Sequence, residues 1–454
     1  MEQSGFIVGI DFGSSKIVGV VGRKNEQGVI TILASESIAS DGCMKFGVIY
    51  NIDEAAGKFK KLINLLENKI GKKIGKVYVS IAGKSLRAIE HHETKLQAEN
   101  TSVTFATLDK MEQQAKLNKP DFFTNYSVLA PEYYLDGKYE SDPIDKPAST
   151  IEGRYRLVIG RPNIKNNLIK TISEKVQIEI AGFIVGPVAT GALVVDEPDR
   201  EAGCALVDFG AATTTVSIYK DGLLRHMAVI PFGGRTVTKD IAALGFAFPS
   251  AETYKIRYGK VGKDKTRAET GNDVSPDVDL RELNKVIQLR EDEILLNVIN
   301  QIKLSGYSDK LDAGIITIGA ASQLNGLIEH FALKAQLPVK RGVVKRVYIN
   351  NAADLLQNLA YTQCLGLLIF ANENCEKKDL PVPEPEYVAP VKPAVTQSQS
   401  EVQPQAKEEI EEPELKSKKS KKDKDDKGGG RQTSIFGLFE KIQNFGGTMF
   451  KDEE

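Results

Sequence analysis

The first 380 residues alternate short apolar runs with longer amphipathic stretches. Runs such as FIVGIDFG (6–13) and CALVDFG (204–210) are rich in apolar and β-branched residues and end at a glycine, as buried strands do. The stretches between such runs repeat apolar residues at helical spacing. The alternation predicts an α/β fold, with helices packed on sheets.

Two apolar runs belong to longer segments that resemble each other. Residues 6–22 read FIVGIDFGSSKIVGVVG, and residues 203–219 read GCALVDFGAATTTVSIY. Each predicts a β-hairpin whose turn is made of small and hydroxyl residues. One such segment is compatible with an ordinary surface hairpin. Two of them, each opening a lobe, predict an internally duplicated fold with a nucleotide held between the hairpins.

The residue types in these turns suit a phosphate site. Gly13, Ser14 and Ser15 leave room for backbone amides and hydroxyls to approach phosphate oxygens, and Lys16 adds a positive charge. Asp11, near the end of its strand, can hold the water shell of Mg²⁺. The second segment offers the matching set Asp208, Gly210, Thr213 and Thr214.

A third segment, GIITIGAASQLNGL (314–327), predicts a strand, a small-residue turn and a helix start. Gly319, Ala320 and Ala321 leave space for a flat adenosine, and Ser322 can cap the following helix. A plain strand-to-helix turn would look the same in isolation. Beside the two hairpins, the segment favours nucleotide binding.

Composition excludes several classes of protein. The 454 residues carry 60 basic and 61 acidic side chains, so the chain lacks the basic excess of a protein that coats nucleic acid, and we expect no nucleic-acid partner. Four scattered cysteines and four histidines show no metal-ligand spacing, which predicts neither zinc nor disulfides. No transmembrane span or signal peptide is expected, so we expect the cytoplasm.

The chain changes character near residue 380. Residues 381–430 hold seven of the 18 prolines and one aromatic residue, and they contain an acidic block followed by a lysine-rich block. Such a segment buries too little apolar surface to fold, so we expect a disordered linker.

The last residues, 431–454, predict an amphipathic helix. Thr433 or Ser434 can cap its start, and Gly446 can end it. An isolated helix of this length needs a surface to bury its apolar face, either a lipid interface, a groove on a partner or the chain's own body. The long tether favours a membrane surface. The residues expected to enter it are Ile435, Phe436, Leu438, Phe439, Ile442 and Phe445.

The motifs resemble the actin, sugar-kinase and heat-shock-chaperone ATPase superfamily, and most closely the FtsA family of bacterial cell-division proteins. GIDFGSSK (9–16) and LVDFGAATTT (206–215) are similar to the phosphate motifs of the superfamily, and GAASQLNGL (319–327) is similar to its adenosine motif. The most FtsA-like run is residues 223–259, which carries Gly233, Gly234, Thr238, Asp240, Glu252 and Lys255.

The resemblance implies a duplicated, actin-like (ribonuclease H-like) two-lobed ATPase fold with an inserted small α+β subdomain. Residues 1–84, 163–200 and 346–380 would form the first lobe, and residues 85–162 an insert of the kind called 1C. The second lobe would comprise residues 201–345, with its own insert at about 235–310. Within residues 85–162 the pattern predicts a strand, a helix capped by Thr107 and two more strands.

The resemblance also implies residue roles. Asp11 and Asp208 would organise Mg²⁺ through waters, while Ser14, Ser15, Lys16, Thr213 and Thr214 would contact the phosphates of ATP. The ribose and adenine would lie against Gly233, Gly234, Glu252, Lys255 and Gly319. Ala211, Ala212 and Thr215 depart from the family pattern, and no water-activating base stands out. We therefore expect ATP binding with at most slow hydrolysis, and we assign no catalytic residue.

By the same resemblance, the chain would polymerise head to tail on the cytoplasmic face of the inner membrane at the division site. It would anchor FtsZ there through the C-terminal tail of FtsZ, and later division proteins would contact the 1C-like insert. Two alternatives are another actin-like scaffold, such as a pilus-assembly platform protein, and a small-molecule kinase of the superfamily. Neither alternative explains both the insert and the tethered C-terminal helix.

Overall fold

The computed structural model describes residues 5–262 and 279–377. The predicted linker (381–430) and the predicted membrane helix with Ile435, Phe436, Leu438, Phe439, Ile442 and Phe445 lie outside the described residues. Within the described ranges, no helix is long and apolar enough to cross a membrane.

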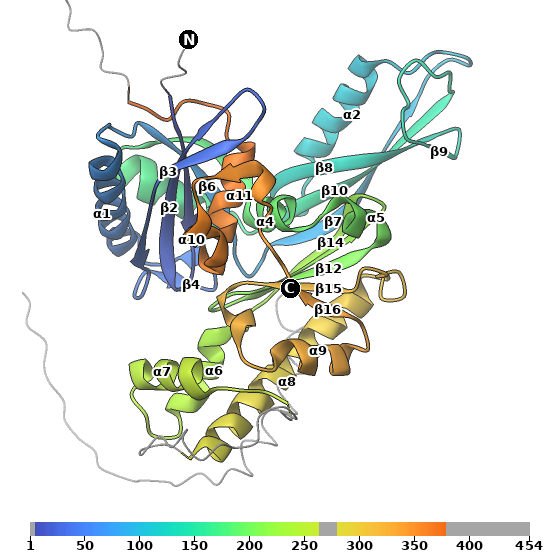
Figure 1. The fold of residues 1–454 in the computed structure, drawn as a ribbon. Coiled ribbons are helices and arrows are strands. Elements are labelled where there is room, and N and C mark those ends of the chain that lie inside the picture. The colour runs from blue at the N-terminus through green and yellow to red at the C-terminus, as the bar shows by residue number, and fades with distance from the viewer. Residues whose placement is uncertain (1–4, 263–278, 378–454) are drawn as a thin grey trace, which may run out of the picture. The chain divides into compact units, whose positions relative to one another are not determined.

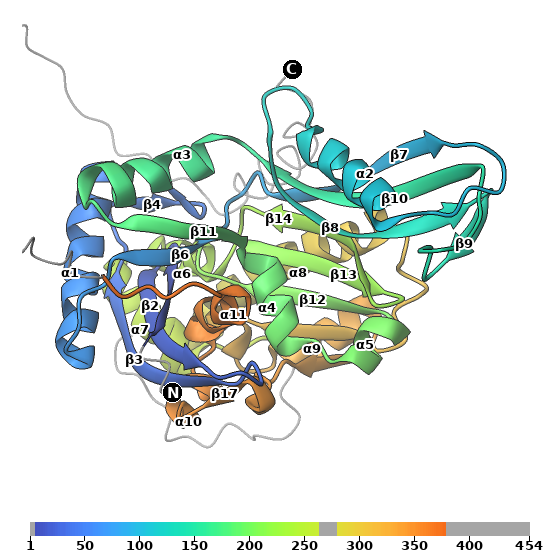
Figure 2. The same cartoon turned by 90° about the horizontal axis from the view of Figure 1, so that it is seen from above.

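The first lobe is built on a six-stranded sheet covered on both faces. Its strand order is β11-β6-β1-β2-β3-β17, with α1 and α11 on opposite sides (Figures 1 and 2). Both faces of β1 and β2 are buried, which explains their near-continuous apolar sequences. The elements are β1 Ile7–Phe12, β2 Lys16–Lys24, β3 Ile30–Ala39, β6 Lys76–Ile81, β11 Glu179–Val185, β17 Ile349–Asn350, α1 Ile52–Ile70 and α11 Thr362–Phe370.

The second lobe repeats five of the six strands of the first. The order β16-β15-β12-β13-β14 matches β11-β6-β1-β2-β3, with the same parallel and antiparallel pairings in both lobes. The predicted duplication is therefore confirmed in the sheets. The elements are β12 Cys204–Phe209, β13 Thr214–Lys220, β14 Leu223–Ile230, β15 Ile315–Ile318, β16 Val339–Arg341, α6 Gly234–Ala242, α7 Phe248–Tyr258, α8 Leu280–Leu304 and α9 Leu327–Ala335.

The insert forms a small sheet covered by one helix, with its own core around Tyr155 and Met111. The predicted elements are present, but the helix starts earlier than expected, because Thr104 rather than Thr107 is its N-cap and accepts a bond from the amide of Thr107 at 3.2 Å. The sequence pattern also missed β9. The elements are β7 Arg87–Leu96, α2 Phe105–Leu117, β8 Thr124–Leu135, β9 Lys138–Glu140 and β10 Thr150–Gly160.

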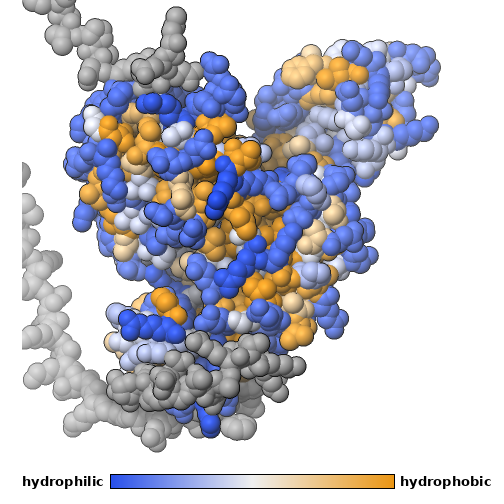
Figure 3. Space-filling model, viewed as in Figure 1, coloured by the Kyte–Doolittle hydropathy of each residue, from blue (hydrophilic) through white to orange (hydrophobic). Residues whose placement is uncertain are grey.

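The sheet of the insert joins that of the second lobe, although β7 follows directly on β6 of the first lobe. Arg87 of β7 pairs with Ala228 of β14, which makes one nine-stranded sheet. The contact is reinforced by an ion pair between Arg225 of β14 and Glu132 of β8, both largely buried. The insert projects beyond both lobes, and apolar side chains gather on its surface near α2 (Figure 3).

Two helices join the lobes. α4 (Gly186–Val194) follows β11 of the first lobe and leads through α5 (Glu197–Ala202) into the second lobe, while α11 packs on both α4 and β1. The remaining elements are β4 Met44–Lys45, β5 Val48–Ile49, α3 Asn163–Ile169, a π-helical turn Lys170–Lys175, 3₁₀ turns at Ala320–Gln323, Arg346–Tyr348 and Leu359–Tyr361, and α10 Ala353–Gln357.

A glycine permits the close approach of α11 to α4. A Cβ atom at Gly366 would lie 2.4 Å from the carbonyl oxygen of Ala189, whereas one at Gly57 on the exposed face of α1 would meet nothing within 4 Å. We predict that Gly366→Ala costs about 1–3 kcal/mol of stability through overpacking. The matched control Gly57→Ala should raise stability by about 0.5–1 kcal/mol, because alanine is the better helix former. Urea unfolding of both variants measures the difference, and equal effects would contradict the packing argument.

Candidate functional site

The first hairpin turn is fixed by the loop that follows β3. Gly13 donates its amide to the carbonyl of Lys16 at 3.1 Å, which closes the turn. Ser40 donates its hydroxyl to the carbonyl of Gly13 at 2.8 Å and its amide to the carbonyl of Ser15 at 3.0 Å. The hydroxyl of Ser14 accepts the amide of Gly47 at 3.0 Å. The turn is thus held in place by backbone and hydroxyl contacts that the local sequence alone did not reveal.

Asp11 is buried near the end of β1. Its carboxylate accepts hydrogen bonds from the Ser80 hydroxyl at the end of β6 and from the Gln363 amide on α11, the latter at 2.6 Å. Burial raises the pKa of Asp11, and the two hydrogen bonds partly offset this. Sequence reasoning missed Ser80 and Gln363, because neither belongs to a motif and both reach Asp11 from distant elements.

The second hairpin repeats the first. Gly210 donates its amide to the carbonyl of Thr213 at 2.9 Å, which closes the turn after β12. Thr213 is partly exposed, but Thr214 is fully buried and donates its hydroxyl to the carbonyl of Phe232 at 2.9 Å. The structure therefore leaves Thr213, rather than Thr214, on the accessible side of the turn.

Asp208 occupies the place in the second lobe that Asp11 occupies in the first. Burial, together with the negative charge of Asp11, raises the pKa of Asp208 to about 6. The charge of Asp11 therefore lies near enough to Asp208 to disfavour its ionised form. Because neither carboxylate has a cationic partner among the described residues, the pair suits a bound cation.

Gly319 packs directly against Asp208. It has φ +89°, and a Cβ atom there would lie 2.3 Å from a carboxylate oxygen of Asp208 and 2.4 Å from the carbonyl oxygen of Phe209. The predicted helix cap is wrong: Ser322 lies in a 3₁₀ turn and donates its hydroxyl to the carbonyl of Gly319 at 2.7 Å, while Gly326 is the N-cap of α9.

The start of α6 and the middle and last turn of α7 complete this side of the site. Lys255 of α7 donates to the carbonyl of Gly234, the hydroxyl of Thr238 and the carboxylate of Glu252, at 2.8–2.9 Å. Gly233 precedes α6, and a Cβ atom there would lie 2.5 Å from the carbonyl oxygen of Gly210. The residues predicted for the ribose side therefore meet the second hairpin.

Two further residues adjoin this cluster: Ala321, which the sequence pattern placed near the adenosine, and Glu291, which sequence reasoning missed. Ala321 lies beside Gly234, since its side chain would be 2.9 Å from a Cβ atom at Gly234. Glu291 of α8 is buried near Lys255, and burial raises its pKa to about 7. One of its carboxylate oxygens has no hydrogen-bond partner within the described residues. Glu291 lies on the side of α8 that is otherwise made of buried apolar residues. From the sequence alone, its charge would place it on a solvated face.

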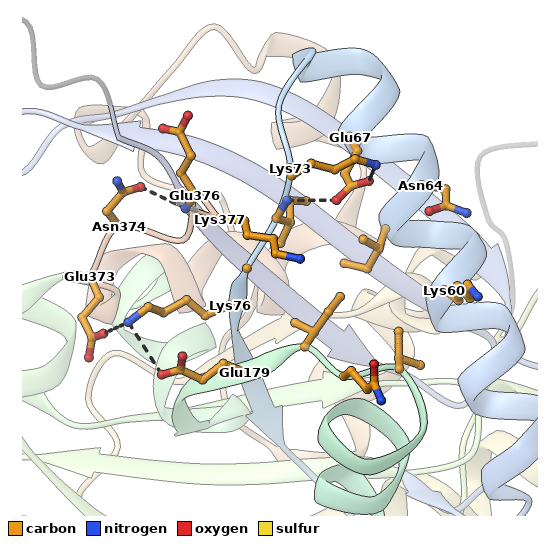
Figure 4. Close-up of a pocket in the computed structure, with 16 residues that line it drawn as sticks. Lys60, Asn64, Glu67, Lys73, Lys76, Glu179, Glu373, Asn374, Glu376 and Lys377 are labelled. Carbon is orange, nitrogen blue, oxygen red and sulfur yellow. Dashed lines mark hydrogen bonds and ion pairs between the residues drawn. The ribbon is translucent and has the colours of Figure 1, made fainter. Parts of the chain in front are cut away.

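A separate hollow of about 930 Å³ lies in the first lobe, beside the start of β6 and the end of α1 (Figure 4). Its rim carries four lysines and four glutamates, several of which pair with each other, such as Lys73 with Glu67 and Lys76 with Glu373. It contains no predicted phosphate residue and no glycine-rich turn. The hairpins, not this hollow, are the candidate nucleotide site.

Comparisons with known proteins support one family. The model of the family "Cell division protein FtsA" matches residues 205–366. The cell division protein FtsA of Pseudomonas aeruginosa is 29% identical over 379 residues, which cover 81% of this chain and 90% of that protein. FtsA of Escherichia coli K12 is 26% identical over 388 residues, covering 81% and 90%. This chain is thus similar to FtsA over about four fifths of its length, and these relatives support a role in cell division.

A solved structure supports the fold of this chain independently. The PilM-PilN type IV pilus biogenesis complex contains a chain that matches 80% of this one and is itself covered to 98%, with a TM-score of 0.58 at 14% identity. At that identity the likeness concerns the fold alone. The pilus-platform alternative shares this fold, but the family match and the 26–29% identical relatives favour FtsA.

The raised pKa of Asp208 makes a stability prediction for the ligand-free protein. Its folded pKa of about 6 exceeds the ordinary 3.8, so the native state binds more protons between these values and loses stability as pH rises from about 4 to 6. Asp208→Asn should remove this loss. The variant should match the native chain at pH 4 and exceed its unfolding free energy by roughly 1–3 kcal/mol at pH 7.

Urea unfolding at several pH values measures this gap. The matched control Asp309→Asn changes an exposed carboxylate remote from the hairpins and should show no growing difference between pH 4 and 7. A variant at Asp208 that is less stable than the native chain at pH 7 would contradict the assignment.

Proposed function

We propose that the chain is an actin-like cell-division protein that binds MgATP between its two lobes. The observation that carries the proposal is the pair of acidic side chains, Asp11 and Asp208, at equivalent strand ends of a duplicated fold. Each is followed by a small-residue hairpin turn. Two nearby carboxylates destabilise each other until a cation neutralises them, and Mg²⁺ with its water shell is a cation that oxygen ligands bind.

The residue roles follow from position. Asp11 and Asp208 would hold Mg²⁺ through its waters, and Ser14, Ser15, Lys16 and Thr213 would face the phosphates from the two turns, with Thr214 supporting the second turn from beneath. Gly233, Gly234, Glu252 and Lys255 would line the ribose and adenine side, and Gly319 would leave space beside Asp208. The three glycines let their segments approach the second hairpin and each other closely, because a Cβ atom at any of them would collide with neighbouring protein atoms.

Nucleotide binding would control self-association. In this proposal MgATP favours head-to-tail polymers, and hydrolysis is at most slow. The methyl groups of Ala211 and Ala212 limit the approach of backbone to ligand, and no side chain is assigned as a water-activating base.

The polymer would work at a membrane. We propose that the C-terminal segment 431–454 inserts its apolar face into the cytoplasmic side of the inner membrane, and that many such segments on one polymer give firm binding through multivalency. The polymer would anchor FtsZ there through the C-terminal tail of FtsZ. The insert would contact later division proteins, and its exposed apolar side chains support that role; among them are Phe105 (72% exposed), Leu117 (82%) and Phe122 (82%).

Two glycines with positive φ test the nucleotide site. Gly319→Ala places a methyl group against Asp208, whereas Gly245 has φ +104° and open space around its Cβ position. Both substitutions carry the backbone cost of about 1 kcal/mol, but only Gly319→Ala should weaken MgATP binding, by at least ten-fold. Isothermal titration of MgATP into the two variants measures this. Equal affinities in both would exclude the proposed position of the nucleotide.

The C-terminal segment is tested with vesicles. Phe439→Glu puts a charge on the predicted apolar face and should abolish co-sedimentation of the full chain with vesicles of anionic and zwitterionic lipid, as should truncation after Gly430. The control Asn444→Glu adds the same charge on the opposite side of the predicted helix and should leave binding nearly unchanged. Binding that survives both Phe439→Glu and truncation would exclude this segment as the anchor.

A further inference from the structure

One ion pair links the lobes beside the candidate nucleotide site. Arg235, the second residue of α6 in the second lobe, donates to the carboxylate of Asp41 in the loop after β3 of the first lobe, at 2.6 Å. The two residues are 194 positions apart. No sequence motif indicates the pair, because Asp41 lies in a loop and Arg235 was assigned no role.

Each end of this ion pair is tied to one hairpin turn. Ser40, next to Asp41, donates its amide and hydroxyl to carbonyls of the first turn, at 3.0 and 2.8 Å. Arg235 donates its own amide to the carbonyl of Ala211 in the second turn, at 2.7 Å. The contacts therefore run without a break from the first turn through Ser40, Asp41 and Arg235 to the second turn.

A charged side chain beside the pair has another partner, so Asp41 and Arg235 pair with each other. Lys58 donates to the backbone carbonyl of Asp41, while its ion pair, at 3.1 Å, is with Glu54. Among the described residues, Asp41 is the acidic partner found for the Arg235 side chain. The Asp41 side chain is 71% exposed and that of Arg235 27%; an ion pair with one partner so exposed to solvent adds little to folding stability, so the contact is suited to opening and closing.

We propose that Asp41 and Arg235 form a clasp that closes the two lobes over the phosphate end of the nucleotide and must open before the nucleotide leaves. This inference rests on the proposed binding of MgATP between the hairpins. Arg235 acts here as a positioning residue: its partner is Asp41, and it sets the residence time of the nucleotide without contacting the phosphates.

Dissociation of a fluorescent ATP analogue, measured by stopped flow with the full chain and Mg²⁺, tests the clasp. Arg235→Gln and Asp41→Asn should each speed dissociation by about two- to five-fold, the range that the coupling of an exposed ion pair allows. The double variant should be no faster than either single one. The reversed pair, Asp41→Arg with Arg235→Asp, should return toward the native rate, which a merely structural role would not produce. Added salt should speed release from the native chain and not from the neutral variants.

The control is Lys340→Gln, which removes a pair of similar length, 2.7 Å, with Asp199 of the connecting helix α5 and should not change the rate. Unchanged rates in both single variants would overturn the clasp. So would a more than ten-fold loss of affinity confined to Arg235→Gln, because Arg235 would then bind the phosphates directly.

Failure of the proposed function would look different. If the native chain bound no nucleotide, the clasp would still be read from hydrogen exchange of the ligand-free protein. Amides of the two hairpins, residues 7–24 and 204–220, should then exchange faster in both single variants than in the native chain and the Lys340→Gln control. Unchanged hydrogen exchange in both single variants would overturn the clasp, whether or not the chain binds nucleotide.

Discussion

The arrangement of the site depends on the close contact between α11 and α4. Gly366 of α11 lies so near the carbonyl of Ala189 that a single methyl group would not fit, and a Cβ atom at Gly186 would collide with Gln363. Gln363 also donates to Asp11. One helix contact therefore sets the relation of the two lobes and positions an acidic side chain at their junction. A shift of α11 would disturb both at once, because packed helices do not deform smoothly.

The second organising force is electrostatic. Asp11 and Asp208 are brought together by the duplicated sheets, and their raised pKa values show that the ligand-free state holds charge in an unfavourable place. A ligand that carries a cation relieves this and stabilises the folded chain by mass action. The exposed Asp41–Arg235 contact adds a weaker link between the lobes, one that forms and breaks easily.

The insert extends this connection to the surface. Although β7 follows a strand of the first lobe, it pairs with β14, and Arg225 reaches Glu132 across the same boundary. The base of the insert therefore contacts both lobes, while α2 projects away from them (Figure 1). Phe105 and Leu117 of α2 are exposed apolar side chains. A partner bound to the insert would bind a surface that is mechanically joined to the nucleotide-binding lobes.

The sequence by itself determined the hairpins, the duplication, the elements of the insert and the acidic and small residues at the turns. Those features depend on residues close together in the chain, where strand patterns and turn chemistry act. Helix starts were predicted less well: Thr104 caps α2 in place of the nearby Thr107, and a 3₁₀ turn occupies Ser322 so that α9 begins only after Gly326. Only the tertiary structure brought Ser80 and Gln363 to Asp11, buried Glu291 and paired Asp41 with Arg235. Such contacts join residues that are tens to hundreds of positions apart, and the packing of sheets and helices, rather than any local pattern, decides which of them meet.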